Sequence, residues 1–114
     1  MALEFDRSII GKIFDETLFP PVTQEELIGY ATSLGETNPL YTDEAAAAKG
    51  PYGGLIASPT FVTKLRANKF TPEHLPKFGK VGFDGGRDLE LYEPVRPGDQ
   101  LTMLSTIHEI YEKT

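Results

Sequence analysis

Cysteine is absent from this chain of 114 residues, and histidine occurs only twice, at His74 and His108. Without cysteine the chain can form neither a disulfide nor a thiolate metal site. Two isolated histidines, one between prolines and one in an apolar stretch, do not make a metal site. We therefore expect no metal and no cofactor. The lack of cysteine also fits a cytoplasmic protein.

Long apolar runs and an excess of positive charge are missing as well. No run approaches the roughly 18 apolar residues of a transmembrane helix, so we expect no membrane partner. Eleven Lys and Arg face 17 Asp and Glu, which gives a net charge of −6. A surface of that sign repels nucleic-acid phosphates, so we expect no nucleic-acid partner either. A local basic patch can still bind a small anionic ligand.

The composition that remains is that of one ordinary globular domain. Hydrophobic residues make up 39% of the chain and charged residues 25%, as in typical globular domains. The length is less than one average domain. We therefore interpret residues 1–114 as a single domain, one so short that it buries a modest core and gains much from a partner.

The clearest local pattern is a helix from Thr23 to Leu34. Thr23 and Glu26 form a T-x-x-E capping box at its start, and Gly35 supplies the C-terminal stop. Apolar residues recur at helical spacing on one face. These residues are Leu27, Tyr30, Ala31 and Leu34.

Two further helices are predicted from their caps. Asp43 caps a short helix over residues 44–49 that Gly50 ends. Ser58 caps the next one, with Pro59 at its first position, where a missing N–H costs nothing. This third helix runs to about Asn68, and its apolar stripe is Phe61, Val62 and Leu65.

The strands are predicted mainly near the C-terminal end. Residues 1–16 suit a short helix or irregular arm, and residues 17–22 suit an edge strand or an extended segment. Leu89 and Leu91 alternate with polar residues in a half-buried strand. A turn over residues 93–99 leads into a strand over residues 101–111. This layout predicts an α+β fold, with a helix packed on one face of an antiparallel sheet.

The predicted sheet is unfinished. Two or three strands barely make a stable sheet. We therefore expect that the domain is incomplete at its C-terminal end or that a partner supplies the missing strands.

Three segments in order resemble a known family. They read GETNPLYTD at residues 35–43, PYGGLIASPTF at 51–61 and DLELYEPVRPGDQLT at 88–102. Together they resemble the MaoC-like branch of the hotdog fold, the (R)-specific enoyl-CoA hydratases and 3-hydroxyacyl dehydratases. The ending IHEIYEK is typical of the N-terminal, fungal fatty-acid-synthase-like dehydratase subgroup. The resemblance covers about residues 15–114 and implies an antiparallel sheet wrapped around a central helix, Ser58 to about Asn68.

The catalytic positions depart from the pattern of that family. In active members a loop aspartate and histidine activate water and exchange a proton with the substrate. Here the resemblance places Glu36 at the aspartate and Tyr41 at the histidine, and a phenol is a poor base at neutral pH. Pro59 stands at or next to the glycine whose N–H would polarise the thioester carbonyl, and proline has no N–H to donate. Glu36 and Tyr41 are therefore degenerate catalytic positions.

The same resemblance implies which residues contact the substrate. These residues are Asn38, Gly54, Ser58, Pro59 and Thr60. The implied ligand is an acyl-CoA or an acyl-carrier-protein thioester. The implied partner is a second hotdog subunit, in a homodimer or in a heterodimer with an active subunit.

Three functions follow as hypotheses. The first is an acyl-thioester-binding, catalytically degenerate subunit or half of a hydratase or dehydratase. The second is a stand-alone enoyl-CoA hydratase that uses Glu36. The third is a structural hotdog partner that only stabilises a complex.

Several of these residues also have a purely structural interpretation. Glu36 can be a solvated loop residue, and Tyr41 can pack on the core. Ser58 is far better explained as an N-cap than as a nucleophile, because no G-x-S-x-G surrounds it. A basic cluster on the third helix could meet the phosphates of coenzyme A, although a solvated helix face explains it better. Its members are Lys64, Arg66 and Lys69.

Overall fold

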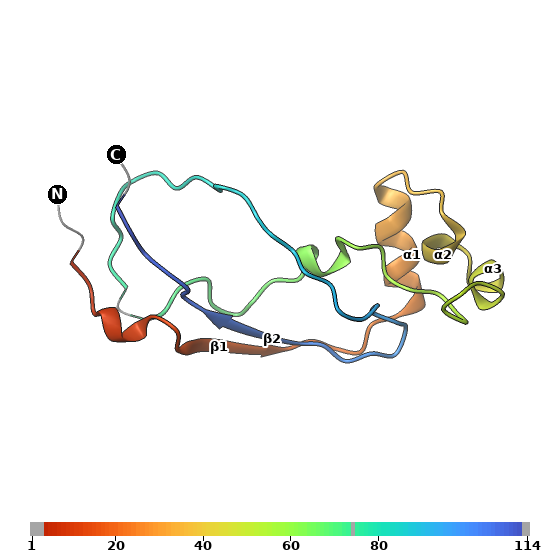
Figure 1. The fold of residues 1–114 in the computed structure, drawn as a ribbon, viewed down its shortest axis with the longest axis horizontal. Coiled ribbons are helices and arrows are strands. Elements are labelled where there is room, and N and C mark those ends of the chain that lie inside the picture. The colour runs from red at the N-terminus through yellow and green to blue at the C-terminus, as the bar shows by residue number, and fades with distance from the viewer. Residues whose placement is uncertain (1–3, 74, 113–114) are drawn as a thin grey trace. The chain divides into compact units, whose positions relative to one another are not determined.

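The structure, a computed structural model, describes residues 4–73 and 75–112 (Figure 1). The interpretation of His74 lies outside these residues. By their internal contacts the residues form two compact units. Unit 1 takes the described residues up to Thr17, those from Ala67 to Asp88, and those from Thr102 onward. Unit 2 is formed by residues 18–66 and 89–101.

Unit 1 contains most of a two-stranded sheet, in which β1 (Ile13–Leu18) pairs with β2 (Thr102–Thr106). The Gly11 N–H, before β1, donates to the carbonyl oxygen of Ile107, after β2, at 2.8 Å. The start of one strand thus meets the end of the other, and the pairing is antiparallel. A short 3-10 turn, η1 (Arg7–Ile9), precedes β1.

The buried residues of β1 are polar and form a hydrogen bond with each other. Asp15 and Thr17 lie on the same side of the strand, because side chains alternate along it. The Thr17 hydroxyl donates to the Asp15 carboxylate at 2.6 Å and accepts the N–H of Asn68 at 3.0 Å. The hydrogen bond to Asn68 holds β1 against the part of unit 1 that begins at Ala67.

The prediction for the first 16 residues is only partly correct. The irregular arm exists, but residues 13–16 are strand, because Gly11 turns the chain at φ +83 and β2 offers a pairing edge. The extended segment predicted over residues 17–22 is strand only to Leu18. The two prolines that follow have no N–H for a ladder.

In unit 2 the first predicted helix is confirmed as α1 (Gln24–Ser33). The Glu26 N–H donates to the Thr23 hydroxyl at 3.1 Å, and the Thr23 N–H donates to the Glu26 carboxylate at 3.3 Å. Gly35, at φ +76, ends the helix. Leu34 was wrongly placed on the buried face: it is the C-cap and 58% exposed. The buried residues are Leu27 and Ala31.

Two short helices follow, α2 (Pro39–Thr42) and α3 (Glu44–Ala48). The predicted cap of α3 is confirmed, since the Asp43 carboxylate accepts the N–H of Ala46 at 3.1 Å. α2 was not predicted. Its signal was an Asn N-cap followed by proline at the first helical position.

The third predicted helix is wrong in length. Only a 3-10 turn, η2 (Phe61–Lys64), forms, and Leu65 returns to extended backbone. Ser58 does not act as a cap, and Thr60, the N-cap residue, makes no side-chain cap bond. β-Branched residues at positions 60, 62 and 63 also disfavour a helix.

The hydrophobic core lies in unit 2, around Phe61. The ring of Phe61 is 1% exposed and meets the ring of Tyr30 edge-on, with centroids 5.6 Å apart. Val62 and Leu65, predicted as buried, are half-buried. The other buried members of the cluster are Val22, Leu27, Ala47, Leu55 and Ala57.

The strand predicted around Leu89 and Leu91 is wrong. Both side chains are exposed, at 43% and 53%, and no ladder bond forms there within the described residues. The turn over residues 93–99 is confirmed: Gly98, at φ +91, donates its N–H to the Val22 carbonyl oxygen at 2.7 Å. The following strand is shorter than the predicted residues 101–111.

Candidate functional site

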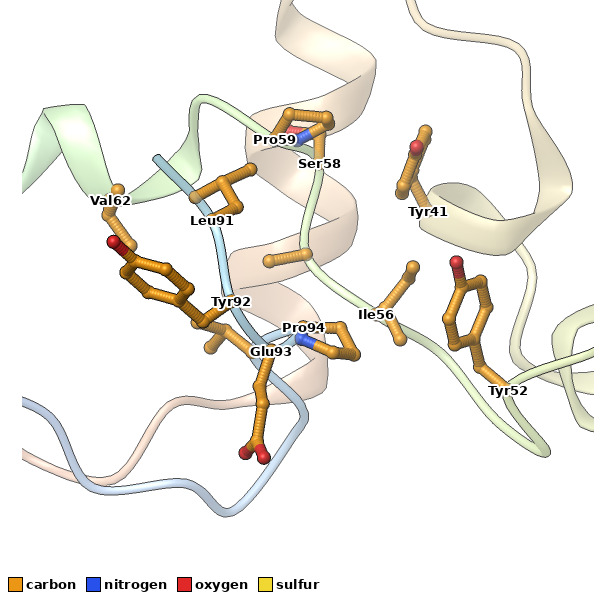
Figure 2. Close-up of a pocket in the computed structure, with 12 residues that line it drawn as sticks. Tyr41, Tyr52, Ile56, Ser58, Pro59, Val62, Leu91, Tyr92, Glu93 and Pro94 are labelled. Carbon is orange, nitrogen blue, oxygen red and sulfur yellow. The ribbon is translucent and has the colours of Figure 1, made fainter. Parts of the chain in front are cut away.

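Unit 2 contains a cavity of about 350 Å³ (Figure 2). Tyr41 of α2 lines it, together with side chains from the loop before η2 and from residues 91–95. Figure 2 shows Tyr41 and Tyr52 on the side of Ile56, and Tyr92 on the side of Val62. The loop residues that line the cavity are Tyr52, Ile56, Ala57, Ser58 and Pro59, and Val62 follows in η2.

Two hydrogen bonds, one between backbone groups and one from a side chain to the backbone, hold the two walls of the cavity together. The Ala57 N–H donates to the Val95 carbonyl oxygen at 2.8 Å. The Arg96 guanidinium donates to the Tyr52 carbonyl oxygen at 2.7 Å. Segments about 40 residues apart in the sequence are therefore joined at two points. Three consecutive residues of the loop wall are buried, namely Ile56, Ala57 and Ser58.

Ser58 supplies the most unusual atom of the cavity wall. The residue is 5% exposed, and its hydroxyl oxygen is buried with no hydrogen-bond partner in the structure. A buried hydroxyl without a partner costs about 1–3 kcal/mol. Its neighbour Pro59 also lines the cavity and has no N–H to offer. The Ser58 hydroxyl is therefore the free donor at this point of the wall.

Glu36 and Asn38, from the loop before α2, do not line the cavity. The Glu36 carboxylate accepts the N–H groups of Thr37 and Asn38, both at 3.0 Å. The Asn38 amide oxygen accepts the N–H of Leu40 at 3.0 Å and so caps α2. The structure brings Tyr41 to the cavity and leaves the Glu36 carboxylate bonded within its own loop.

Gly54 and Thr60 also lie outside the lining. Gly54 is buried, and the next N–H, of Leu55, donates to the Glu44 carboxylate at 3.2 Å. The Tyr30 hydroxyl donates to the Thr60 carbonyl oxygen at 3.0 Å. Of the residues predicted to contact substrate or perform catalysis, the cavity therefore gathers Tyr41, Ser58 and Pro59.

Sequence reasoning missed the lining residues Tyr52, Tyr92 and Glu93. Glu90 accepts a hydrogen bond from the Tyr92 hydroxyl, and this bond raises the pKa of that phenol. Among the described residues that line the cavity, Glu93 is the one carboxylate, and none is a histidine. No local pattern marked these residues, because long-range backbone bonds bring their segment to the site.

The three cations proposed for coenzyme A phosphates all have local partners. Lys64 lies 3.9 Å from Glu26, and Lys69 lies 3.4 Å from Glu73. The Arg66 guanidinium donates to the Thr63 carbonyl oxygen at 2.8 Å. These contacts favour the structural interpretation of the cluster.

The described residues contain neither a metal-binding cluster nor a membrane-spanning helix. Residues 4–73 and 75–112 hold no group of three or more His, Asp or Glu side chains arranged to bind a metal. Among the helices of the same residues, none combines the length and apolar character needed to cross a membrane.

The comparison with known families identifies the class of protein. Residues 8–114 match the family described as "FAS1-like, dehydratase domain region". The chain belongs to this family of dehydratase domains. The membership confirms the resemblance to MaoC-like dehydratases and the α+β hotdog class.

Individual relatives carry a common name. A UPF0336 protein of Streptomyces avermitilis is 32% identical over 114 residues, which cover 95% of this chain and 75% of the relative. One from Streptomyces coelicolor is 31% identical with the same coverage of both chains. One from Thermobifida fusca is 27% identical over 113 residues, covering 95% of this chain and 74% of the relative.

Proposed function

We propose that this chain binds an acyl thioester in the cavity of unit 2. It would do so as a catalytically degenerate subunit or half of an (R)-specific enoyl-CoA hydratase or 3-hydroxyacyl dehydratase. One observation carries the proposal: the cavity wall holds a buried hydroxyl, that of Ser58, with no hydrogen-bond partner among the described residues. A thioester carbonyl oxygen would accept its hydrogen bond, and the apolar lining would receive the acyl chain.

The proposal of a degenerate catalytic site is supported by the residues at the catalytic positions. A hydratase needs a base for water and an acid for the substrate carbon. Tyr41 stands at the position of the histidine, and the Glu36 carboxylate is bonded to the amides of Thr37 and Asn38. Pro59 cannot donate an N–H to the carbonyl. These features support binding without the full acid–base pair.

A second hotdog subunit completes the proposal. Leu89 and Leu91 are exposed at 43% and 53%, and a large exposed apolar surface marks an interaction site. We propose that the chain pairs either with a copy of itself or with an active subunit. The absence of cysteine supports a cytoplasmic location for this complex.

Calorimetry with crotonyl-CoA tests the binding. The chain should bind the thioester, and Ser58→Ala should weaken binding about threefold to tenfold, the worth of one uncharged hydrogen bond. Ser33→Ala is the matched control, because the Ser33 hydroxyl bonds to the Tyr30 carbonyl oxygen on α1. Affinity should stay unchanged in this control. Absence of any binding by the wild type would leave only the purely structural role.

Enoyl absorbance tests the degenerate role. Addition of crotonyl-CoA to the chain alone should give hydration far below the roughly 1–10³ per second typical of enzymes. Hydration at an ordinary enzyme rate, abolished by Glu36→Gln, would instead establish a stand-alone hydratase.

A further inference from the structure

Positive charge is concentrated in one stretch of this acidic chain. Residues 64–87 hold six of the 11 Lys and Arg but only two of the 17 Asp and Glu. That stretch therefore carries +4, and the rest of the chain, with five bases and 15 acids, carries −10. A local excess of positive charge attracts an anionic partner.

The part of this stretch without ion pairs is the basic segment, defined as residues 77–87 of unit 1. Its cations are Lys77, Lys80 and Arg87, and all three are exposed. Within the described parts of the chain, none of them forms a salt bridge with an acidic side chain. The one acid of the segment, Asp84, accepts the N–H of Gly86 at 2.9 Å. The three charges are thus available to a partner.

Apolar side chains are interleaved with these cations. Phe78 is 41% exposed, Val81 71% and Phe83 90%. Figure 1 draws the segment without helix or strand. Exposure of apolar side chains such as phenylalanine to water is unfavourable, so a group of them on the surface indicates an interaction site. Aromatic residues and arginine are enriched in protein interfaces.

The N-terminal part of unit 1 anchors this segment. The ring of Phe78 meets the ring of Phe5 edge-on, with centroids 5.8 Å apart. The guanidinium carbon of Arg7 lies 4.7 Å from the centroid of the Phe5 ring. Arg7 is itself exposed, so the contact extends the basic and aromatic character beyond the segment.

We propose that the basic segment is the docking surface for an acidic protein. Resting on the proposed function, that protein is the carrier that presents the acyl thioester to this chain. Phosphates of a free coenzyme require only a compact group of cations. Cations spread over the segment and alternating with exposed rings fit a protein surface, where charge steers the encounter and apolar contacts hold it.

Binding of an acyl carrier protein bearing a crotonyl thioester tests this docking surface. The test variant is Lys77→Glu with Lys80→Glu, and the matched control is Lys12→Glu with Lys49→Glu, two exposed lysines outside the segment. Fluorescence anisotropy should show a loss of at least about tenfold for the test variant and less than about twofold for the control. Phe83→Ala should also weaken binding. The carrier without its acyl group should still bind, because docking uses the protein surface.

Calorimetry with crotonyl-CoA on the same variants separates this inference from the proposed function. The affinity for the small thioester should be the same in wild type, test variant and control. Equal loss of carrier binding in test and control variants would overturn the docking surface. So would binding of RNA or anionic lipid vesicles through Lys77 and Lys80 more tightly than the carrier. Binding of crotonyl-CoA without any binding of the carrier would overturn the docking surface and leave the proposed function standing.

Discussion

The Ala57 N–H donates to the Val95 carbonyl oxygen at 2.8 Å, and this bond closes the cavity of unit 2 between its two walls. One residue further along, Arg96 adds a second link through its 2.7 Å bond to the Tyr52 carbonyl oxygen. The site therefore depends on contacts between segments far apart in the sequence. A local pattern cannot encode such contacts.

Arg96→Ala should destabilise the chain. A hydrogen bond from a charged group is worth about 1.5–3 kcal/mol, and Arg96 as a residue is half-buried. The control is Arg66→Ala, because within the described part of the chain the Arg66 guanidinium donates to carbonyl oxygens of its own turn, those of Thr63 and Leu65. That variant should stay within about 0.5 kcal/mol of the wild type. Urea unfolding measures both, and equal losses would show that the link to Tyr52 does not hold the walls.

Thr23→Ala should lower the free energy of unfolding by about 0.5–2 kcal/mol, because it removes the hydroxyl that caps α1. Thr37→Ala makes the same chemical change at an exposed residue that bonds through its backbone N–H. Thermal unfolding followed by circular dichroism should show a lower midpoint for the first variant alone. A shift of the same size in both would mean that the capping box contributes nothing specific.

The features predicted most accurately from the sequence are the helix caps, which depend on residues close together in the chain. The capping box of Thr23 and Glu26 joins residues three apart, and Asp43 caps α3 in the same way. Ser58 has the same local signature, yet the chain continues past it into a short 3-10 turn. Its hydroxyl remains buried and unpartnered at the cavity. A cap motif therefore indicates a helix only if the residues behind it favour one.

The strand around Leu89 and Leu91 failed for a different reason. Alternation of apolar and polar residues predicts a strand that has a neighbour, and the described chain supplies none there. The cavity was likewise only partly predictable. The family resemblance pointed to Tyr41, Ser58 and Pro59, whereas Tyr52 and the segment with Glu93 reach it through tertiary bonds.

Phe61→Ala should cost about 3–5 kcal/mol, because the ring is 1% exposed at the centre of the core. Where that variant fails to fold, Phe61→Leu should still lower the midpoint of unfolding by a smaller amount. The matched control is Phe83→Ala, since the Phe83 ring is 90% exposed. Its stability should stay within about 0.5 kcal/mol of the wild type. An unmoved midpoint for Phe61→Leu would place the core elsewhere.

Tyr41→His should not restore hydratase activity to this chain. General acid–base help is worth about 10²–10⁴-fold, but an imidazole needs a carboxylate partner and a polarised carbonyl to provide it. The Glu36 carboxylate is bonded to the amides of Thr37 and Asn38, and Pro59 has no N–H. Hydration of crotonyl-CoA should therefore rise less than about tenfold, which is below that range.

Tyr52→His is the matched control, because it places an imidazole in the same cavity at a residue that no catalytic pattern assigns. Both variants should hydrate crotonyl-CoA at similarly low rates, followed as loss of enoyl absorbance. A rise of about 100-fold or more in Tyr41→His alone would show that Glu36 leaves its loop and serves the new imidazole. In that case the scaffold would be intact, and the single substitution at residue 41 would explain the degenerate site.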